Sequence, residues 1–138
     1  MKRAIVVVGA ALALAAYGEE PPIPSGYEFG KPRLLAQQLL WGVAHGVRLL
    51  GTACHRRGDA AAALAYVDWL DRQGPRLREA ERDLSRHYFK RDQAPMEAID
   101  GALQLKPTLG QADADLGEAC ASLPEALTAP RYDLEHYY

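Results

Sequence analysis

Two cysteines carry the clearest chemical consequence in this chain of 138 residues. Cys54 falls on the apolar side of one helical segment, and Cys120 falls on the apolar side of a later one. An exported chain meets an oxidising compartment, where two such thiols tend to form a disulfide. Closing the loop of about 66 residues between them would contribute about 4 kcal/mol in the chain-entropy model. We therefore predict a Cys54–Cys120 disulfide, with two separate buried thiols as the alternative, and no redox role because no Cys-x-x-Cys pair occurs.

The four histidines do not form a metal-binding pattern. His45 and His55 share the polar side of one helical segment, but they are ten residues apart, which is roughly 15 Å along a helix. No His-x3-His, His-Glu-x-x-His or Cys/His cluster occurs. Cys54 and His55 cannot act as a nucleophile and base, because adjacent helical residues point about 100° apart. We therefore predict solvated or hydrogen-bonded histidines, no metal ligands and no cofactor.

Carboxylates recur in pairs after residue 60. Two carboxylates can perform acid–base chemistry when they are buried in a cleft that gives them different pKa values. Asp68 pairs with Asp71, and Glu79 pairs with Asp83. Arginines stand among them, and interleaved charges of this kind are typical of a solvated helix face. No Gly-rich phosphate loop, Gly-x-Ser-x-Gly elbow or dinucleotide fingerprint occurs. The sequence therefore predicts that the protein is not an enzyme.

Three residues of the first long segment are candidates for binding a partner. Trp41, His45 and Arg48 lie close together on its polar side. A side chain as large as tryptophan is normally buried, so Trp41 is predicted either to lie under the aromatic tail of the chain or to anchor a partner. Tryptophan and arginine are typical hot spots of protein interfaces.

A row of basic residues gives a second set of candidates. Arg78, Arg82, Arg86 and Lys90 recur every four residues along the outer side of the second long segment. Such a row could meet an acidic protein, anionic lipid head groups or a cell-wall polymer. Acidic residues flank the row, so a solvated face is the alternative.

Two long amphipathic segments must position these residues. In the segment from Arg33 to Arg57, a rotation of 100° per residue predicts one buried side, formed by Leu35, Leu39, Leu40, Val43, Val47, Leu50 and Cys54. The opposite side is polar and carries Gln37, Gln38, His45, Arg48, Thr52, His55 and Arg56. Gly58 suits a left-handed position at the end of this helix, and Asp59 suits the N-cap of the next. The chain is therefore predicted to turn back immediately.

The second segment covers residues 60–90 and is predicted to lie antiparallel to the first. Gly74-Pro75 interrupts it, because proline lacks the backbone N–H and clashes with the preceding turn. Leu70, Leu77 and Leu84 nevertheless recur every seven residues across the interruption. We predict one kinked helix or two nearly collinear helices, which form an αα-hairpin with the first.

The elements after residue 92 are predicted to be short. Pro95 suits the first turn of a helix that ends before Pro107, and residues 113–121 form another helical segment. Ser122 to Glu125 has the spacing of a capping box that would begin a further turn. The aromatic tail, residues 131–138, is predicted to dock on its own domain. The fold class is therefore all-α: a small helical bundle built on a long antiparallel αα-hairpin, with shorter C-terminal helices and one disulfide.

The N-terminal residues predict export. Residues 1–18 have the pattern of a secretory signal peptide, with two basic residues followed by the apolar run Ala4 to Ala16. This run of thirteen residues is shorter than the roughly 20 that span a bilayer, and an uncleaved anchor is the alternative. Residues 19–32 are predicted to be an extended Pro/Gly-rich leader, and residues 33–138 a single helical domain. The mature protein is expected in a bacterial periplasm or outside the cell, without a transmembrane span.

The charge of the chain argues against a nucleic-acid partner. Cleavage would remove Lys2 and Arg3 and change the formal net charge from −2 to −4. Binding to phosphate chains requires a basic footprint instead. The expected partner is another periplasmic protein, and the composition carries no indication of an oligomeric state.

The order of these features resembles a known layout. The leader, the Cys-bearing first segment, the Ala/Tyr-rich stretch from Ala60 to Tyr66 and the late cysteine are arranged as in periplasmic immunity proteins that neutralise cell-wall amidase toxins. The likeness spans roughly Leu34 to Leu123, and it transfers no functional residue because it depends on arrangement alone. It implies an immunity protein or inhibitor. The residues themselves favour a small exported helical binding protein, with a hydrolase or a ligand- or metal-carrying periplasmic protein as a distinct alternative.

Overall fold

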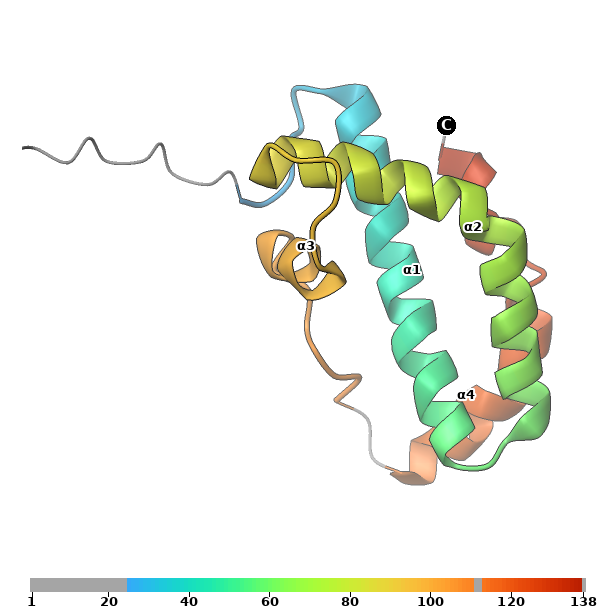
Figure 1. The fold of residues 1–138 in the computed structure, drawn as a ribbon. Coiled ribbons are helices and arrows are strands. Elements are labelled where there is room, and N and C mark those ends of the chain that lie inside the picture. Colours follow the sequence, from blue (N-terminus) through green and yellow to red (C-terminus); the bar gives the residue numbers. More distant parts are fainter. Residues whose placement is uncertain (1–24, 111–112, 138) are drawn as a thin grey trace, which may run out of the picture.

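The computed structural model describes residues 25–110 and 113–137. In this part of the chain, four α-helices and two short 3-10 helices follow one another (Figure 1): α1 (Pro32–Arg56), α2 (Ala60–Phe89), α3 (Met96–Ala102), α4 (Asp113–Ala126), η1 (Pro130–Tyr132) and η2 (Leu134–Tyr137). No strand occurs within the described ranges, and the predicted all-α class is confirmed. None of these helices combines the length and the apolarity that crossing a membrane requires. The predicted signal peptide and the first part of the predicted leader lie outside the described residues.

The corner between α1 and α2 is built as predicted. Gly58 has a φ of +80°, a conformation that glycine adopts without the steric cost of a side chain. The Asp59 side chain accepts a hydrogen bond of 3.1 Å from the backbone N–H of Ala62 and so caps α2. This short connection makes α1 and the first half of α2 antiparallel neighbours.

α2 is a single bent helix. Pro75 lies inside it and lacks the N–H that would bond to the carbonyl of Asp71. Figure 1 shows that the first half of α2 runs beside α1, whereas the second half turns and crosses the N-terminal part of α1. One kinked helix, the first of the two predicted forms, is therefore confirmed.

The disulfide joins the end of α1 to the middle of α4. Cys54 and Cys120 are fully buried, with their sulfur atoms 2.08 Å apart and their Cα atoms 5.5 Å apart. The predicted link is thus confirmed, and it holds the late helix against the hairpin. The largest fully buried apolar side chains of the core are Trp69, Tyr88, Leu40, Leu84, Ile99 and Leu134.

α4 runs without a break to Ala126, so the prediction that a new turn begins at Ser122 is wrong. The hydroxyl of Ser122 donates to the carbonyl of Ala119 in the preceding turn, and Pro124 lies inside the helix. A proline inside a helix costs about 3 kcal/mol, whereas each large apolar side chain contributes roughly 1.5–3 kcal/mol when buried. The helix persists because its inner face buries several residues: Leu116, Cys120, Leu123 and, just beyond its end, Leu127.

The aromatic tail docks on its own domain, as predicted, and η2 lies against both α1 and α2. Leu134 is fully buried, and its backbone N–H donates to the side chain of Gln73 at 2.9 Å. The indole N–H of Trp69 donates to the carbonyl of Tyr132 at 2.7 Å. These contacts place the tail over Trp69.

Part of the predicted polar side of α1 is buried, which corrects the sequence analysis. Gln37 and Gln38 are fully buried, whereas Leu39, predicted to be buried, is 45% exposed. The amide of Gln38 donates to the Tyr88 hydroxyl at 2.7 Å, and this hydroxyl donates to the carbonyl of Gly26 at 2.8 Å. The crossing half of α2 and the segment before α1 therefore cover a side of α1 that its own pattern leaves open.

Removal of the disulfide should destabilise the fold. Replacing Cys54 and Cys120 together by alanine should lower the free energy of unfolding by about 4 kcal/mol, because the bond closes a loop with a sequence separation of 66. Urea denaturation followed by circular dichroism measures this change. A reductant should destabilise the wild type and leave the double variant unaffected. Equal stability of the oxidised wild type and the double variant would contradict the prediction.

Two glycines of α1 form a matched pair for testing the contact between α1 and α2. A Cβ added at Gly51 would lie 2.3 Å from Cγ of the Tyr66 ring, so Gly51→Ala should destabilise the protein by about 1–3 kcal/mol. A Cβ added at Gly46 would meet nothing within 4 Å, so Gly46→Ala should stabilise it by about 1 kcal/mol through helix propensity. Urea denaturation of both variants should give changes of opposite sign. Changes of the same sign would show that the two helices do not approach closely at Gly51.

Candidate functional site

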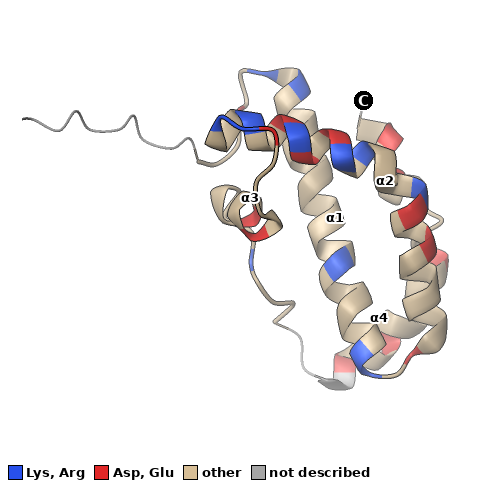
Figure 2. Cartoon of the chain, in the orientation of Figure 1, with Lys and Arg blue, Asp and Glu red and all other residues tan. Residues whose placement is uncertain are grey.

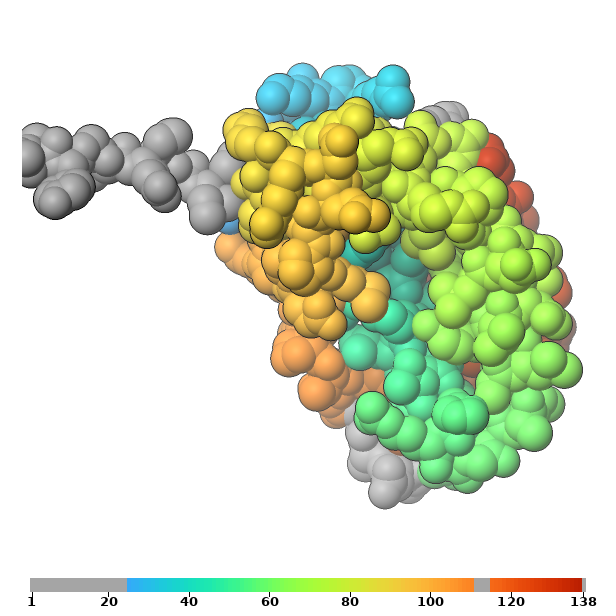
Figure 3. Space-filling view, in the orientation of Figure 1, coloured from blue at the N-terminus to red at the C-terminus, as the bar shows by residue number. Residues whose placement is uncertain are grey.

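A groove of about 390 Å³ lies between α1, α2 and α3, and we name it the α1–α2–α3 groove. Figure 3 shows it as a hollow with the teal α1 at its floor, the green α2 on one side and the yellow-to-orange α3 on the other. Its apolar lining is Trp41, Ala44, Tyr66, Leu70, Leu77 and Met96. Its polar lining is His45, Arg48, Arg78 and Glu81.

Helical spacing and the bend of α2 together create this groove. The α1 residues at positions 41, 44, 45 and 48 follow the spacing that places side chains on one face of a helix. The first half of α2 contributes Tyr66 and Leu70, and the residues after Pro75 contribute Leu77 and Glu81. Because α2 bends, both of its halves border the same face of α1.

Asp100 of α3 organises one wall of the groove. One carboxylate oxygen accepts the indole N–H of Trp41 at 2.8 Å, and the other accepts an Arg48 guanidinium N–H at 2.6 Å. The side chains of Asp100 and Arg48 are only 15% and 23% exposed, so this charge-assisted bond is partly shielded from water. Trp41 itself is 6% exposed, and its N–H is held by α3 and not by the aromatic tail.

His45 is tied down through both ring nitrogens. Its Nε2 lies 2.6 Å from the carbonyl oxygen of Lys106, and a carbonyl only accepts, so Nε2 carries a proton. Its Nδ1 can then accept from the guanidinium of Arg48, 2.7 Å away. The residue is 7% exposed, and its ring fastens the connection after α3 to α1. His45 therefore lines the groove without offering a free nitrogen to it.

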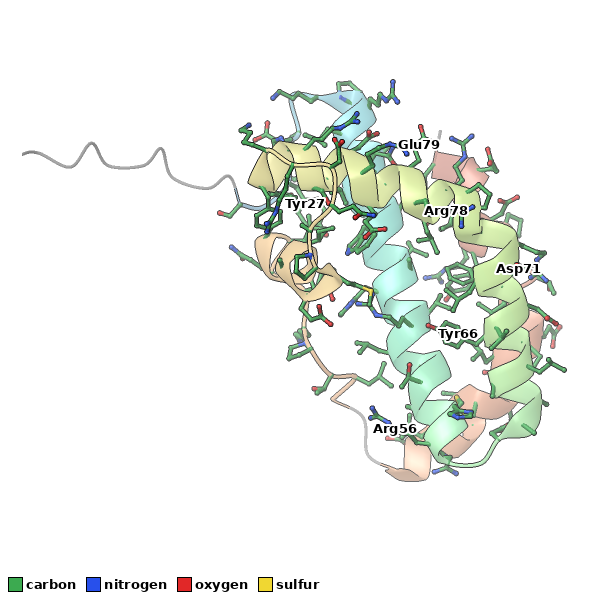
Figure 4. The ribbon with its side chains drawn as sticks, in the orientation of Figure 1. Tyr27, Arg56, Tyr66, Asp71, Arg78 and Glu79 are labelled. Carbon is green, nitrogen blue, oxygen red and sulfur yellow. A yellow bond between two sulfur atoms is a disulfide. The ribbon has the colours of Figure 1, made fainter. Side chains whose placement is uncertain are left out.

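Tyr66 contributes a ring and a neutral hydroxyl. Burial raises the pKa of its hydroxyl, against the charge of Arg48 and a hydrogen bond with Thr52, which lower it. The hydroxyl is therefore protonated at neutral pH. In Figure 4, Tyr66 extends from the first half of α2 toward α1, on the same side of α2 as the groove.

Arg78 stands at the rim of the groove beside the bend of α2 (Figure 4). Its guanidinium folds back over Gly74, where an added Cβ would lie 3.0 Å from Nη1. A polar hollow of about 410 Å³ adjoins it, lined by Arg78, Glu81, Arg82, Asp92 and Gln93. No salt bridge formed among the described residues includes Arg78 or Arg82.

The other members of the basic row lie away from the groove. Arg86 pairs with Asp92 at 2.7 Å, and this hydrogen bond raises the pKa of Arg86. Lys90 is the left-handed C-terminal cap of α2, with a φ of +58°. Figure 2 shows blue and red segments alternating along the second half of α2, so the row is not a continuous basic surface.

A larger groove of about 590 Å³ lies on the opposite side of α1. Its lining includes Val43, Gly46 and Leu50, and its charged side chain is Arg131, whose guanidinium lies 4.9 Å from the centre of the Tyr132 ring. This groove is apolar and carries no second charged side chain. For the part of the chain that the structure describes, no group of three His, Cys, Asp or Glu residues could hold a metal ion.

The structure brings together candidates that the sequence placed on two separate helices. Trp41, His45 and Arg48 of α1 and Arg78 of α2 line one groove, whereas Arg82 adjoins it and the remaining two basic residues do not. Of the apolar lining from α2 and α3, the sequence indicated only Leu70 and Leu77, as a repeat on the second segment, and it did not indicate a role for Asp100. One feature of the sequence could have indicated a role for Asp100: it lies next to the apolar side of a short predicted helix.

Comparisons with family models, with curated proteins and with solved structures find no match for this chain. Function is therefore inferred from the sequence and the structure of this chain.

Asp100→Asn should weaken the wall of the groove that Asp100 organises. The amide keeps an acceptor for Trp41 but loses the charge that pairs with Arg48, so the free energy of unfolding should fall by about 1–3 kcal/mol. Glu97→Gln is the matched control, because Glu97 is an exposed acid of the same helix, and its effect should stay within about 0.5 kcal/mol. Urea denaturation measures both. Equal effects of the two variants would contradict the role given to Asp100.

Proposed function

We propose that this chain is an exported, non-enzymatic protein that binds another protein through the α1–α2–α3 groove. The observation that carries the proposal is the convergence of Trp41, Tyr66, Met96 and two arginines from three helices on one groove. Aromatic residues, methionine and arginine are the types enriched at protein interfaces. The wall of the groove is held by hydrogen bonds before any partner arrives, which reduces the entropy lost on binding.

The groove chemistry favours binding over catalysis. A hydrolase needs titratable groups that point together at a reacting atom, with at least one free to exchange a proton. Both nitrogens of His45 and both carboxylate oxygens of Asp100 already have partners inside the protein. These groups stabilise the wall, which suits a recognition surface.

The disulfide supports the exported part of the proposal. Disulfides persist in the periplasm and outside the cell, whereas the cytosol keeps thiols reduced. The Cys54–Cys120 bond therefore agrees with the signal peptide predicted over residues 1–18. We place the mature protein in a bacterial periplasm or outside the cell.

An immunity protein or inhibitor of a cell-wall amidase toxin is the more specific form of this proposal. The observation that favours it is the bond between the Cys-bearing α1 and the late cysteine, which are two features of the layout that the sequence resembles. A toxin would then be the partner that occupies the groove. The identity of the captured protein separates this form from the general one.

Capture of a periplasmic partner should depend on the rim of the groove. Arg78→Glu and Met96→Glu should each reduce the partner retained by the tagged mature protein by about tenfold or more, as for an interface hot spot. The controls Arg72→Glu and Leu64→Glu make matched changes at exposed positions of α2 outside the groove and should retain it. Quantitative mass spectrometry of the eluates from the organism's own periplasm gives the readout.

The outcomes of this capture experiment are separable. A wild type that retains no partner would contradict a binding function. Equal retention by all four variants would show that the partner binds elsewhere. A retained cell-wall hydrolase whose activity falls on binding would support the immunity form, and a partner of another kind would reject it.

A further inference from the structure

We propose, on the basis of the proposed function, that the α1–α2–α3 groove recognises an acidic segment of the partner protein. A large apolar side chain of this segment enters the groove, and a neighbouring carboxylate pairs with Arg78. This inference names the chemistry of the partner, which the proposed function leaves open.

The apolar half of the recognition follows from the lining. Trp41, Tyr66, Leu70 and Leu77 present rings and aliphatic groups to a space of about 390 Å³. This volume is at the lower end of the range of about 300–1,000 Å³ that ligand pockets occupy, so it suits inserted side chains and not a whole secondary-structure element. An aromatic or long aliphatic side chain would gain most from burial there.

The charged half follows from the arginines at the rim. The charge of Arg48 is matched by Asp100, and Arg86 is matched by Asp92. Arg78 and Arg82, one helical turn apart, form no salt bridge among the described residues. Two acids line the adjoining hollow with them: Asp92, which pairs with Arg86, and Glu81. The rim therefore keeps an excess of positive charge beside an apolar groove, and a guanidinium pairs best with a planar carboxylate.

A protein segment fits these charges better than a nucleic acid does. Phosphate chains need a continuous basic surface, and the second half of α2 alternates in sign (Figure 2). The whole chain has a formal net charge of −2. One or two carboxylates beside an apolar side chain match the local excess of charge without meeting the acidic residues farther along α2.

Short labelled peptides test this chemistry directly on the mature protein. The probe alternates glutamate and phenylalanine, one control replaces glutamate by lysine, and the other replaces phenylalanine by serine. Fluorescence anisotropy should show that the probe binds about tenfold or more tightly than either control, and more weakly as salt rises. Arg78→Glu should lower its affinity by about tenfold or more, whereas Arg72→Glu, an exposed position of the same helix outside the groove, should change it by less than about twofold.

The two tryptophans report where the probe binds. Trp41 lines the groove, whereas Trp69 is fully buried and bonded to the carbonyl of Tyr132. In a two-dimensional NMR titration, the indole N–H signal of Trp41 should shift and that of Trp69 should stay in place. A shift of Trp69 alone, or of neither signal, would overturn the proposal.

Other outcomes separate this inference from the proposed function. Equal binding of the lysine peptide, or tighter binding of a labelled oligothymidylate, would overturn the acidic-segment chemistry. If the Arg78→Glu variant nevertheless fails to retain the natural partner in the capture experiment, the proposed function stands and the acidic-segment chemistry falls. If the probe binds as expected but capture ignores Arg78→Glu, the groove chemistry stands and the proposed use of the groove fails.

Discussion

The bend of α2 at Pro75 is the constraint on which the rest of this molecule depends. A straight helix of 30 residues would be about 45 Å long and would run past the end of α1, which has 25 residues and a length of about 38 Å. Because Pro75 cannot donate to the preceding turn, α2 instead turns and crosses α1. The crossing buries Gln37 and Gln38 and sets Arg78 beside the face of α1 that carries Trp41. The groove is thus a consequence of one residue that interrupts a helix.

The late elements are positioned by ties to α1 and not by their own stability. α3 has seven residues, which is too short to persist alone in water. It is held by the full burial of Ile99 and by the bonds of Asp100 to Trp41 and Arg48. α4 is held by the Cys54–Cys120 bond at the other end of α1. The polar residues of α1 therefore have a structural role first, because they hold α3 and the connection after it against α1.

Local features of the fold could be predicted from the sequence, and features that depend on the path of α2 could not. Gly58 and Asp59 specify the corner through backbone conformation and capping, and the two cysteines lie on the apolar sides of their helices, where an oxidising compartment favours a link between them. Helical periodicity assigns one buried side to each helix, so it placed Gln38 and His45 on the polar side of α1. α1 is in fact covered from several directions, by α2, α3 and the segment before it. The site was predicted as two separate sets of residues because nothing local indicates that Arg78 faces Trp41.

The α1–α2–α3 groove has a neutralised arginine, Arg48, near its floor and an exposed arginine, Arg78, at its rim. This arrangement explains how a surface of this size could be selective. Arg48 is neutralised by Asp100 from within the protein, so an apolar side chain can approach Trp41 without stripping water from an unpaired charge. Arg78 stands at the rim, where its guanidinium is exposed and can exchange water for a carboxylate at small desolvation cost. Affinity would then come from the floor, and discrimination between partners would come from the rim. The larger groove on the other side of α1 lacks this division, because its charged side chain already lies over the Tyr132 ring.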